Sequence, residues 1–334
     1  MKKHLVKILT LVLAIVMLSS CGATNDVPPS SSETFKGAEV KIATLNGPTT
    51  IGVLGLLKGE GNINTYSYEQ IYASADAFAP ALLKNEINVA VIPANAAATL
   101  HKNSGGKIKI AAVNNLGVLY ILEKGNEVNS VEDLKGKTIV ATGAGTTPQY
   151  SLEYILSENG LEVGKDVFVE YKSEATEVIA ALKQGKASVA MLPQPAASKA
   201  PSAVEGVRVA LNLKDEWTKL DETASLVTGV LVVNTEFAEK NPEAVKALLS
   251  DYKASCEMVA NDLDKTAEYL VSLKIAGIEN VELAKKAIPL CNIKYIDGEE
   301  MKTAVSGYLE VLYNANPKSI GGEKPTDNLY YIAK

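Results

Sequence analysis

Histidine and arginine are nearly absent from this 334-residue chain, which excludes several kinds of chemistry. Of its two histidines, His4 lies in a segment that we expect to be cleaved off, so only His101 remains. One histidine leaves a single candidate for a Ser-His-Asp or Cys-His arrangement and excludes a metal site with several histidine ligands. His101 stands beside Lys102 at the end of a predicted helix, 96–102, and we expect it to be solvated. The sequence therefore predicts no catalytic residue, metal or cofactor.

Arg208 is the only arginine. Bidentate recognition of a carboxylate or a similar planar anion by a guanidinium group is therefore available at most once. The β-branched neighbours at 207 and 209 predict a strand with one face toward solvent. We expect a bound ligand to be held mostly by other groups.

The first 20 residues have the composition of a secretory signal. Lys2, Lys3 and Lys7 give a positive start, and the almost wholly apolar run 5–18 is shorter than the roughly 20 residues needed to cross a bilayer. The residues before Cys21 read Leu-Ser-Ser, which resembles the bacterial lipobox, in which the cysteine is acylated and becomes the new N-terminus. The alternative is an ordinary signal peptide with a coincidental Cys21. We expect a signal peptide at 1–20 and lipidation at Cys21.

Residues 21–34 are rich in proline and serine and have no apolar periodicity, which predicts a flexible spacer after the lipid. The body that follows is long enough for two domains. Removing residues 1–20 changes the net charge from −6 to −9. An acidic body without a basic patch argues against nucleic acid as a partner.

Cys256 and Cys291 are the cysteines that remain in the body. Their spacing is not that of metal ligands. An oxidising compartment would permit a disulfide between them, but the sequence cannot show that they are close together. We favour two separately buried thiols.

Two parts of the body repeat one order of elements, about a hundred residues apart. A predicted strand at 40–44 is followed by a turn and a helix, and so is a strand at 138–142, whose helix has Thr147 as its N-cap. Further on, a helix, a strand and a proline-containing loop recur at 74–96 and 173–196. This order is typical of a parallel sheet covered by helices. Chance similarity between generic βα units is the alternative.

The repeat predicts an α/β protein of two lobes, each a mostly parallel sheet flanked by helices. Strand-like runs near 117–122 and 225–233 would carry the chain between the lobes. The last third is predicted to be helical, without strands, and to pack on the first lobe. The first lobe would comprise 35–118 and 232–334, and the second 119–231.

Ligands of open α/β sheets bind beyond the carboxyl ends of the strands, near helix N-termini. In this sequence those positions carry short hydroxyl and amide side chains and almost no charge. Free backbone N–H groups at helix starts can hold an anionic or strongly polar group without arginine. The alternative is that these residues are only caps and turns. The candidate ligand-binding residues are Asn46, Thr49, Thr50, Asn95, Thr146, Thr147, Gln149, Tyr150 and Gln194.

The segment 131–139, with its Asp-Leu-Lys-Gly-Lys element, and the stretch 141–161 resemble the type II periplasmic binding proteins of ABC importers. The nitrate/sulfonate/taurine-binding and thiamine-pyrimidine-precursor-binding groups look most similar. The resemblance covers about 37–315 and implies two hinge strands between the lobes. It also implies capture of a small polar ligand, anionic or heteroaromatic, such as a sulfonate or a pyrimidine. The ligand would pass to permease subunits coupled to a cytoplasmic ATPase, from a monomeric, lipid-anchored, extracytoplasmic receptor.

Two other functions fit this fold. One is a pyrimidine-synthase-like enzyme, but those enzymes use a reactive histidine and a cysteine-rich motif, and neither has a counterpart here. The other is a surface sensor that does not transport, which the sequence does not separate from a receptor. We expect a receptor that is not an enzyme.

Overall fold

The computed structural model describes residues 35–220, 225–275 and 278–333. The predicted signal peptide, Cys21 and the spacer lie outside the described residues. Lys36 begins a compact unit that contains all the elements below. Within the described ranges, no helix is both long and apolar enough to span a membrane.

A seven-stranded sheet forms the first lobe, in the order β12-β5-β11-β4-β1-β2, with β3 also beside β1. Strand β1 pairs in parallel with β2, β3 and β4, whereas β11, β5 and β12 join in antiparallel. All eight residues of β11 are buried, as expected for a central strand. The strands are β1 Glu39–Leu45, β2 Thr65–Ser67, β3 Ile71–Tyr72, β4 Val89–Pro93, β5 Ile108–Leu116, β11 Val227–Asn234 and β12 Ile293–Ile296.

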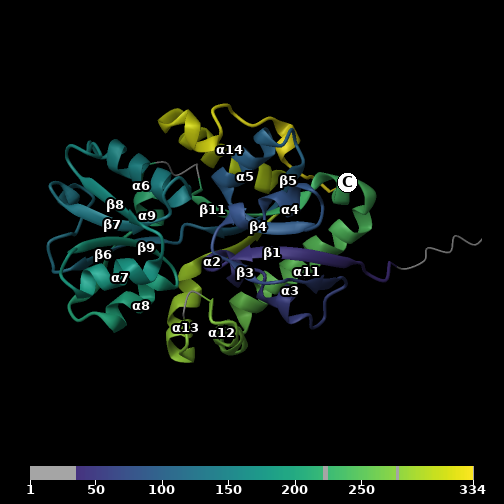
Figure 1. The fold of residues 1–334 in the computed structure, drawn as a ribbon, viewed down its shortest axis with the longest axis horizontal. Helices are drawn as coiled ribbons and strands as arrows, with labels where there is room; N and C mark the ends of the chain where they lie inside the picture. The colour runs from purple at the N-terminus through teal and green to yellow at the C-terminus, as the bar shows by residue number, and fades with distance from the viewer. Residues whose placement is uncertain (1–34, 221–224, 276–277, 334) are drawn as a thin grey trace, which may run out of the picture. The chain divides into compact units, whose positions relative to one another are not determined.

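A five-stranded sheet forms the second lobe, in the order β10-β6-β9-β7-β8. Strand β7 pairs in parallel with β8 and β9, and β6 runs antiparallel to β9 and β10. The strands are β6 Leu119–Lys124, β7 Thr138–Thr142, β8 Phe168–Lys172, β9 Val189–Pro193 and β10 Val207–Asn212. Figure 1 shows this sheet with α6 to α9 around it at the left, and the first sheet at the right.

The predicted two-lobed α/β fold is confirmed, with one refinement to the sheets. Only the repeated βα units pair in parallel, and they do so in matching registers: Ile42 with Val89 in the first sheet and Ile139 with Val189 in the second. The antiparallel pairs come from reversed strands: β11 runs against both β4 and β5, β12 runs against β5, and β6 runs against both β9 and β10. Both sheets are therefore mixed.

Helices cover both sheets. The longer ones are α5 Ala94–Asn103, α6 Thr147–Glu158, α7 Ala175–Lys183, α8 Ala196–Ala203, α9 Leu213–Leu220, α11 Pro242–Asn261, α12 Leu263–Ser272 and α14 Gly298–Ala315. The shorter ones are α2 Pro48–Ile51, α3 Leu54–Lys58, α4 Ala79–Leu83, α10 Thr235–Lys240 and α13 Val281–Ala287. Single 3-10 turns are η1 Ala75–Ala77, η2 Glu132–Leu134, η4 Ile288–Cys291, η5 Pro317–Ile320 and η6 Asp327–Leu329.

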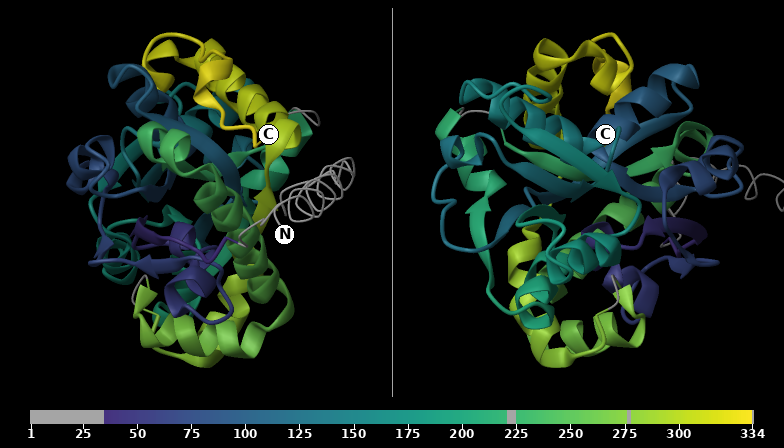
Figure 2. Two further views of the ribbon diagram at one scale, coloured as in Figure 1. Left: turned by 90° about the vertical axis from the view of Figure 1, so that its right-hand side faces the viewer. Right: turned by 60° about the vertical axis from the view of Figure 1, so that its left-hand side comes forward.

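The C-terminal third differs from the prediction in one respect. Helix α14 packs on β5 and β11 of the first lobe, as expected, and lies with the C-terminal turns along one side of the lobe (Figure 2). The expectation that this third contains no strand is wrong, because β12 adds to the edge of the first sheet beside β5. A four-residue strand, Ile-Lys-Tyr-Ile, is too short to give a clear alternating pattern.

The chain crosses between the lobes twice. Gly117 and Val118 join β5 to β6, and the second crossing lies between the end of α9 and the start of β11, where residues 221–224 are not described. Along its whole length β11 pairs with β4 and β5 of the first sheet, so the predicted boundary at 231 falls within one strand. The exact division into lobes stays a prediction.

Candidate functional site

A cavity of about 960 Å³ lies between the two lobes. Its walls come from the carboxyl ends of β1, β4, β7, β8 and β9 and from the turns that follow them, with a contribution from η5. This is where ligands of open α/β sheets are expected. The polar residues of its wall are Asn46, Thr49, Ser74, Asp76, Asn95, Thr99, Asn103, Asn115, Thr142, Thr146, Thr147, Tyr150, Tyr171, Lys172, Ser173, Glu174, Thr228, Lys318 and Ser319.

Most of the predicted ligand-binding residues line this cavity. They are Asn46, Thr49, Asn95, Thr146, Thr147 and Tyr150. Five of these lie at or just before the start of α2, α5 or α6, and Tyr150 lies in the first turn of α6. The structure brings together side chains more than a hundred residues apart, as the repeat predicted. Their contact with a ligand stays a prediction.

Thr50, Gln149 and Gln194 do not line the cavity. The Thr50 hydroxyl is buried and donates to the Leu45 carbonyl at 2.5 Å, so it fixes the turn after β1. Gln149 folds back on its own helix, where its Oε1 accepts the Gly145 N–H at 2.7 Å and its Nε2 donates to Glu153. These two candidates are therefore turn and helix residues.

Gln194 is buried at the start of the turn into α8. Its Oε1 accepts the Ser198 hydroxyl at 2.8 Å, and its Nε2 has no hydrogen-bond partner among the described residues. It lies behind Pro193, which does reach the cavity. The end-of-strand rule found the correct loop here but not the direction of the side chain.

Three helices of eight or more residues begin at this cavity: α5, α6 and α7. Their N-cap residues are Pro93, Thr146 and Glu174, and none of the three makes a side-chain capping hydrogen bond in the described structure. The sequence placed the cap of α6 one residue later, at Thr147. Instead Thr146 has extended backbone angles, and its hydroxyl donates to the Gly143 carbonyl at 2.9 Å. The starts of all three helices lie at the cavity wall, and the helix dipole favours negative charge there.

Two lysines in the cavity wall were missed by the sequence prediction. Lys172 ends β8, and the end-of-strand rule did not reach it because β8 was not among the predicted strands. Lys318 belongs to η5, near the C-terminus, and no local pattern connects it with the loops of the repeat. The Lys172 Nζ lies 3.5 Å from Oε2 of Glu170, while Lys318 has no ion pair within the part of the chain that is described.

The strands that lead between the lobes also contribute polar groups that the prediction missed. Asn115 of β5 and Thr228 of β11 line the cavity, and the Asn115 amide donates to the Thr228 hydroxyl at 3.0 Å. Asn114 continues the network by donating to Asn115 at 2.9 Å and accepting the Tyr252 hydroxyl at 2.5 Å. A hydrogen-bonded row therefore runs from the cavity wall into the first lobe. Strand β5 was not predicted, so neither asparagine was a candidate.

Tyr171 has an enclosed hydroxyl that lacks a hydrogen-bond partner within the described ranges. Its side chain lines the cavity beside Tyr150. Burial raises the pKa of Tyr171 above its ordinary value, and the nearby Glu153 carboxylate adds to the rise. The hydroxyl is therefore neutral and able to donate.

Arg208 is engaged elsewhere and does not line the cavity. Its guanidinium lies 2.8 Å from the buried carboxylate of Glu123 and donates to the Val128 carbonyl at 2.6 Å. Glu123 also accepts the backbone N–H groups of Glu127 and Val128. The single arginine thus fixes a turn of the second lobe, which agrees with the expectation that other groups hold the ligand.

The remaining histidine and cysteines have structural surroundings. His101 is half-buried and its Nδ1 lies 2.6 Å from the Ile108 carbonyl, so the expectation of a solvated side chain is wrong. Cys256 and Cys291 are buried free thiols, as predicted. Burial raises the pKa of Cys256 to about 12 and also raises that of Cys291. Among the described residues, no group of three His, Cys, Asp or Glu side chains could hold a metal ion.

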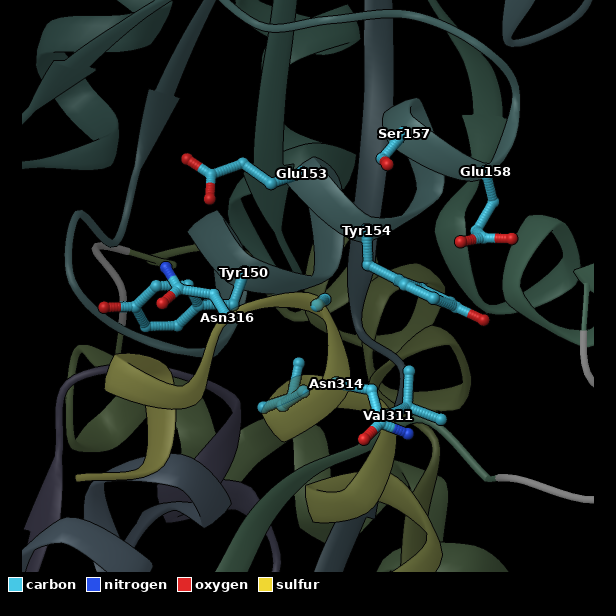
Figure 3. Close-up of a pocket in the computed structure, with 10 residues that line it drawn as sticks. Tyr150, Glu153, Tyr154, Ser157, Glu158, Val311, Asn314 and Asn316 are labelled. Carbon is cyan, nitrogen blue, oxygen red and sulfur yellow. The ribbon is translucent and has the colours of Figure 1, made fainter. Parts of the chain in front are cut away.

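A second, smaller groove of about 560 Å³ runs between α6 and the end of α14. Figure 3 shows Glu153, Tyr154 and Glu158 on the α6 side and Asn314 on the α14 side. Tyr150 belongs to the walls of both this groove and the main cavity. The groove therefore marks where α6 of the second lobe meets α14 of the first.

The family model for the periplasmic substrate-binding protein of phosphonate ABC transporters matches residues 68–285. The match covers more than half of the chain, so this chain belongs to that family. It is the substrate-binding component of an ABC importer, and its class works outside the cytoplasm. The predicted resemblance to periplasmic binding proteins is confirmed. No curated protein matches the sequence.

Solved structures agree with this class. An ABC transporter protein from Parabacteroides distasonis is 27% identical, with 88% of this chain and 99% of that chain covered and a TM-score of 0.73. The periplasmic aliphatic sulphonate binding protein SsuA from Escherichia coli is 16% identical, with coverages of 89% and 92% and a TM-score of 0.69. The nitrate-binding protein NrtA from Synechocystis PCC 6803 is 14% identical, with coverages of 80% and 75% and a TM-score of 0.57. The last two show the shared fold alone.

Proposed function

We propose that this receptor captures a small oxyanion, of the phosphonate or sulfonate kind, in the cavity between its lobes. The observation that carries the proposal is the convergence of α5, α6 and α7 on one cavity without side-chain caps. Backbone N–H groups from both lobes would then bind the negatively charged end of the ligand. Lys172 and Lys318 also lie in this wall, together with Asp76 and Glu174, so the charged side chains balance and the helix starts carry the proposal.

Several features support closure of the lobes on the ligand. The lobes are joined by the short Gly117–Val118 link and by the entry to β11, which fits a hinge. Cavity hydroxyls such as Thr146 and Tyr171 can donate to the remaining oxygens. The aromatic rings of Tyr150 and Tyr171 also leave room for a heteroaromatic group, such as a pyrimidine, as the second ligand class. The loaded monomer would dock on permease subunits, and we propose a receptor without enzymatic activity.

A screen of the full chain in detergent tests the ligand class. We expect methylphosphonate, ethanesulfonate or a related oxyanion to raise the melting temperature, with pyrimidines as a second set. Lys318→Met is expected to weaken oxyanion binding about threefold, since an exposed charge contributes modestly. Lys324→Met is the matched control, because Lys324 pairs with Glu310 at 2.6 Å and lies outside the cavity. Stabilisation by amino acids or peptides alone would contradict the proposal.

We propose that Cys21 carries the lipid that holds the receptor at the membrane. The support is the Leu-Ser-Ser sequence before Cys21 and the acidic body, which would not adhere to anionic lipid by charge. Cys21→Ser is expected to move nearly all of the protein from the membrane fraction to the soluble or retained-precursor fraction. Cys256→Ser, at a buried thiol, should leave the distribution unchanged. An unchanged membrane fraction in Cys21→Ser would show that the cysteine is coincidental.

A further inference from the structure

A hydrogen bond joins the two lobes directly at the wall of the cavity. The Thr147 hydroxyl, at the start of α6 in the second lobe, donates to Asn95 Oδ1, at the start of α5 in the first lobe, at 2.9 Å. Thr147 is 1% exposed and Asn95 is 2% exposed, so the bond is shielded from water. Polar groups buried to this degree are costly to leave without a partner.

Both partners are held in place from behind. The Asn95 Nδ2 donates to the Ser319 carbonyl at 3.1 Å, which leaves its Oδ1 facing Thr147. One turn after Thr147, the Ser151 hydroxyl lies 3.2 Å from the hydroxyl of Tyr308 on α14. Tyr308 is fully buried, and burial raises its pKa to about 12, while hydrogen bonds to Ser151 and Thr147 oppose the rise. One face of α6 is thus bonded to two elements of the first lobe.

These bonds use groups that the sequence assigned to ligand binding. Thr147 has one hydroxyl proton, and it is given to Asn95 in the present arrangement of the lobes. The Asn95 amide likewise has its oxygen and one N–H engaged. When the lobes separate, Thr147 and Asn95 must part, and each must find water instead. Their bond therefore exists only when the lobes are together.

We propose that Asn95 and Thr147 form a latch that sets the population of the closed arrangement before any ligand binds. They are positioning residues, which act on affinity through lobe closure and not by contact with the ligand. A bond that is present in one arrangement and absent in the other shifts the equilibrium by its differential free energy. Because the bond between Asn95 and Thr147 already favours the closed arrangement, the ligand has to supply less free energy for closure.

The chain contains a native probe of this equilibrium. Trp217, its only tryptophan, lies on α9 of the second lobe, and its ring centroid is 5.5 Å from that of Tyr308 on α14 of the first lobe. Trp217 is fully buried in this arrangement. Separation of the lobes would break this ring contact and admit water. Tryptophan emission of the ligand-free protein therefore reports on closure.

The test compares hydroxyl and methyl at residue 147 in the ligand-free full chain. Thr147→Val keeps the shape but removes the donor, and we expect the ratio of open to closed molecules to rise about fivefold. The emission of Trp217 should shift to longer wavelength and be quenched more strongly by acrylamide. Thr147→Ser, which keeps the hydroxyl, should resemble the wild type. Asn95→Leu should reproduce the effect of Thr147→Val, and the double variant should add little to either.

Thr266→Val is the matched control for loss of a buried hydroxyl. Thr266 is fully buried and donates to the Asp262 carbonyl at 2.8 Å within α12, away from the junction of the lobes. It should lower stability without changing the emission. The latch is refuted if Thr147→Val leaves emission and quenching unchanged, or if Thr266→Val changes them equally. Because no ligand is present, failure here leaves the oxyanion proposal intact, and failure of the ligand screen leaves the latch intact.

Discussion

Asp251→Ala is expected to lower the free energy of unfolding by about 4 kcal/mol, the largest stability loss that we predict for one side chain. Asp251 lies on α11 and is 4% exposed. Its two oxygens accept the Ile63 N–H at 2.8 Å, the Asn64 N–H at 3.0 Å and the Tyr66 hydroxyl at 2.8 Å. Alanine would leave three donors without an acceptor, and each such loss costs roughly 1–3 kcal/mol.

Urea unfolding followed by circular dichroism measures this change. Asp264→Ala is the matched control, because the Asp264 side chain is 77% exposed and pairs with Lys285 at the surface. Exposed ion pairs of this kind contribute about 1 kcal/mol or less. Equal midpoints for the two variants would show that the hydrogen bonds to Asp251 contribute little to stability.

Gly143→Ala is expected to weaken ligand binding tenfold or more, the largest effect on function that we predict for a single added methyl group. Gly143 has φ of +87°, and a Cβ atom there would lie 2.6 Å from Cγ of Pro148 in the first turn of α6. The ring is part of the backbone and cannot turn away, so the start of α6 would have to move. Movement of about 1 Å in a positioned group is enough for losses of this size.

Gly145→Ala provides the control within the same loop. Gly145 also has a positive φ, +71°, but an added Cβ would meet nothing within 4 Å. It would carry only the conformational cost of a left-handed residue, roughly 1–2 kcal/mol. Titration calorimetry with the oxyanion found in the screen measures the affinities of the Gly143→Ala and Gly145→Ala variants. Similar affinities for both variants would mean that the position of the α6 start does not govern binding.

The βα repeat could be predicted from the sequence because its signals are local. Runs of apolar residues predict the strands β1, β4, β7 and β9. Glycine and proline at the turns predict where these strands end and where the following helices begin. Strand β5 was missed although it pairs on both sides, with β12 and β11, because its sequence Ile-Lys-Ile-Ala-Ala-Val-Asn-Asn-Leu ends in asparagines that look like a loop. Their partners, Thr228 and Tyr252, are more than a hundred residues away. Pairing at that distance leaves no local pattern.

The candidate site could be predicted as a set of loops but not side chain by side chain. The end-of-strand rule found the turns, and six of the nine named residues line the cavity. Thr50 and Gln194 do not line the cavity, because a side chain in a tight turn faces either the cavity or the core, and packing decides which. Lys318 reaches the cavity only because the last helix returns to the first lobe.

Engagement of Arg208 with Glu123 has a consequence for how a ligand leaves. An arginine in the site could bind an anion in both the open and the closed receptor, since its whole charge belongs to one side chain on one lobe. In the proposed site the compensating charge would come from α5 in one lobe and from α6 and α7 in the other, so no single lobe would hold all of it. A permease that separates the lobes would thereby separate the groups that bind the anion. The ligand could then be released without a competing charge on the permease.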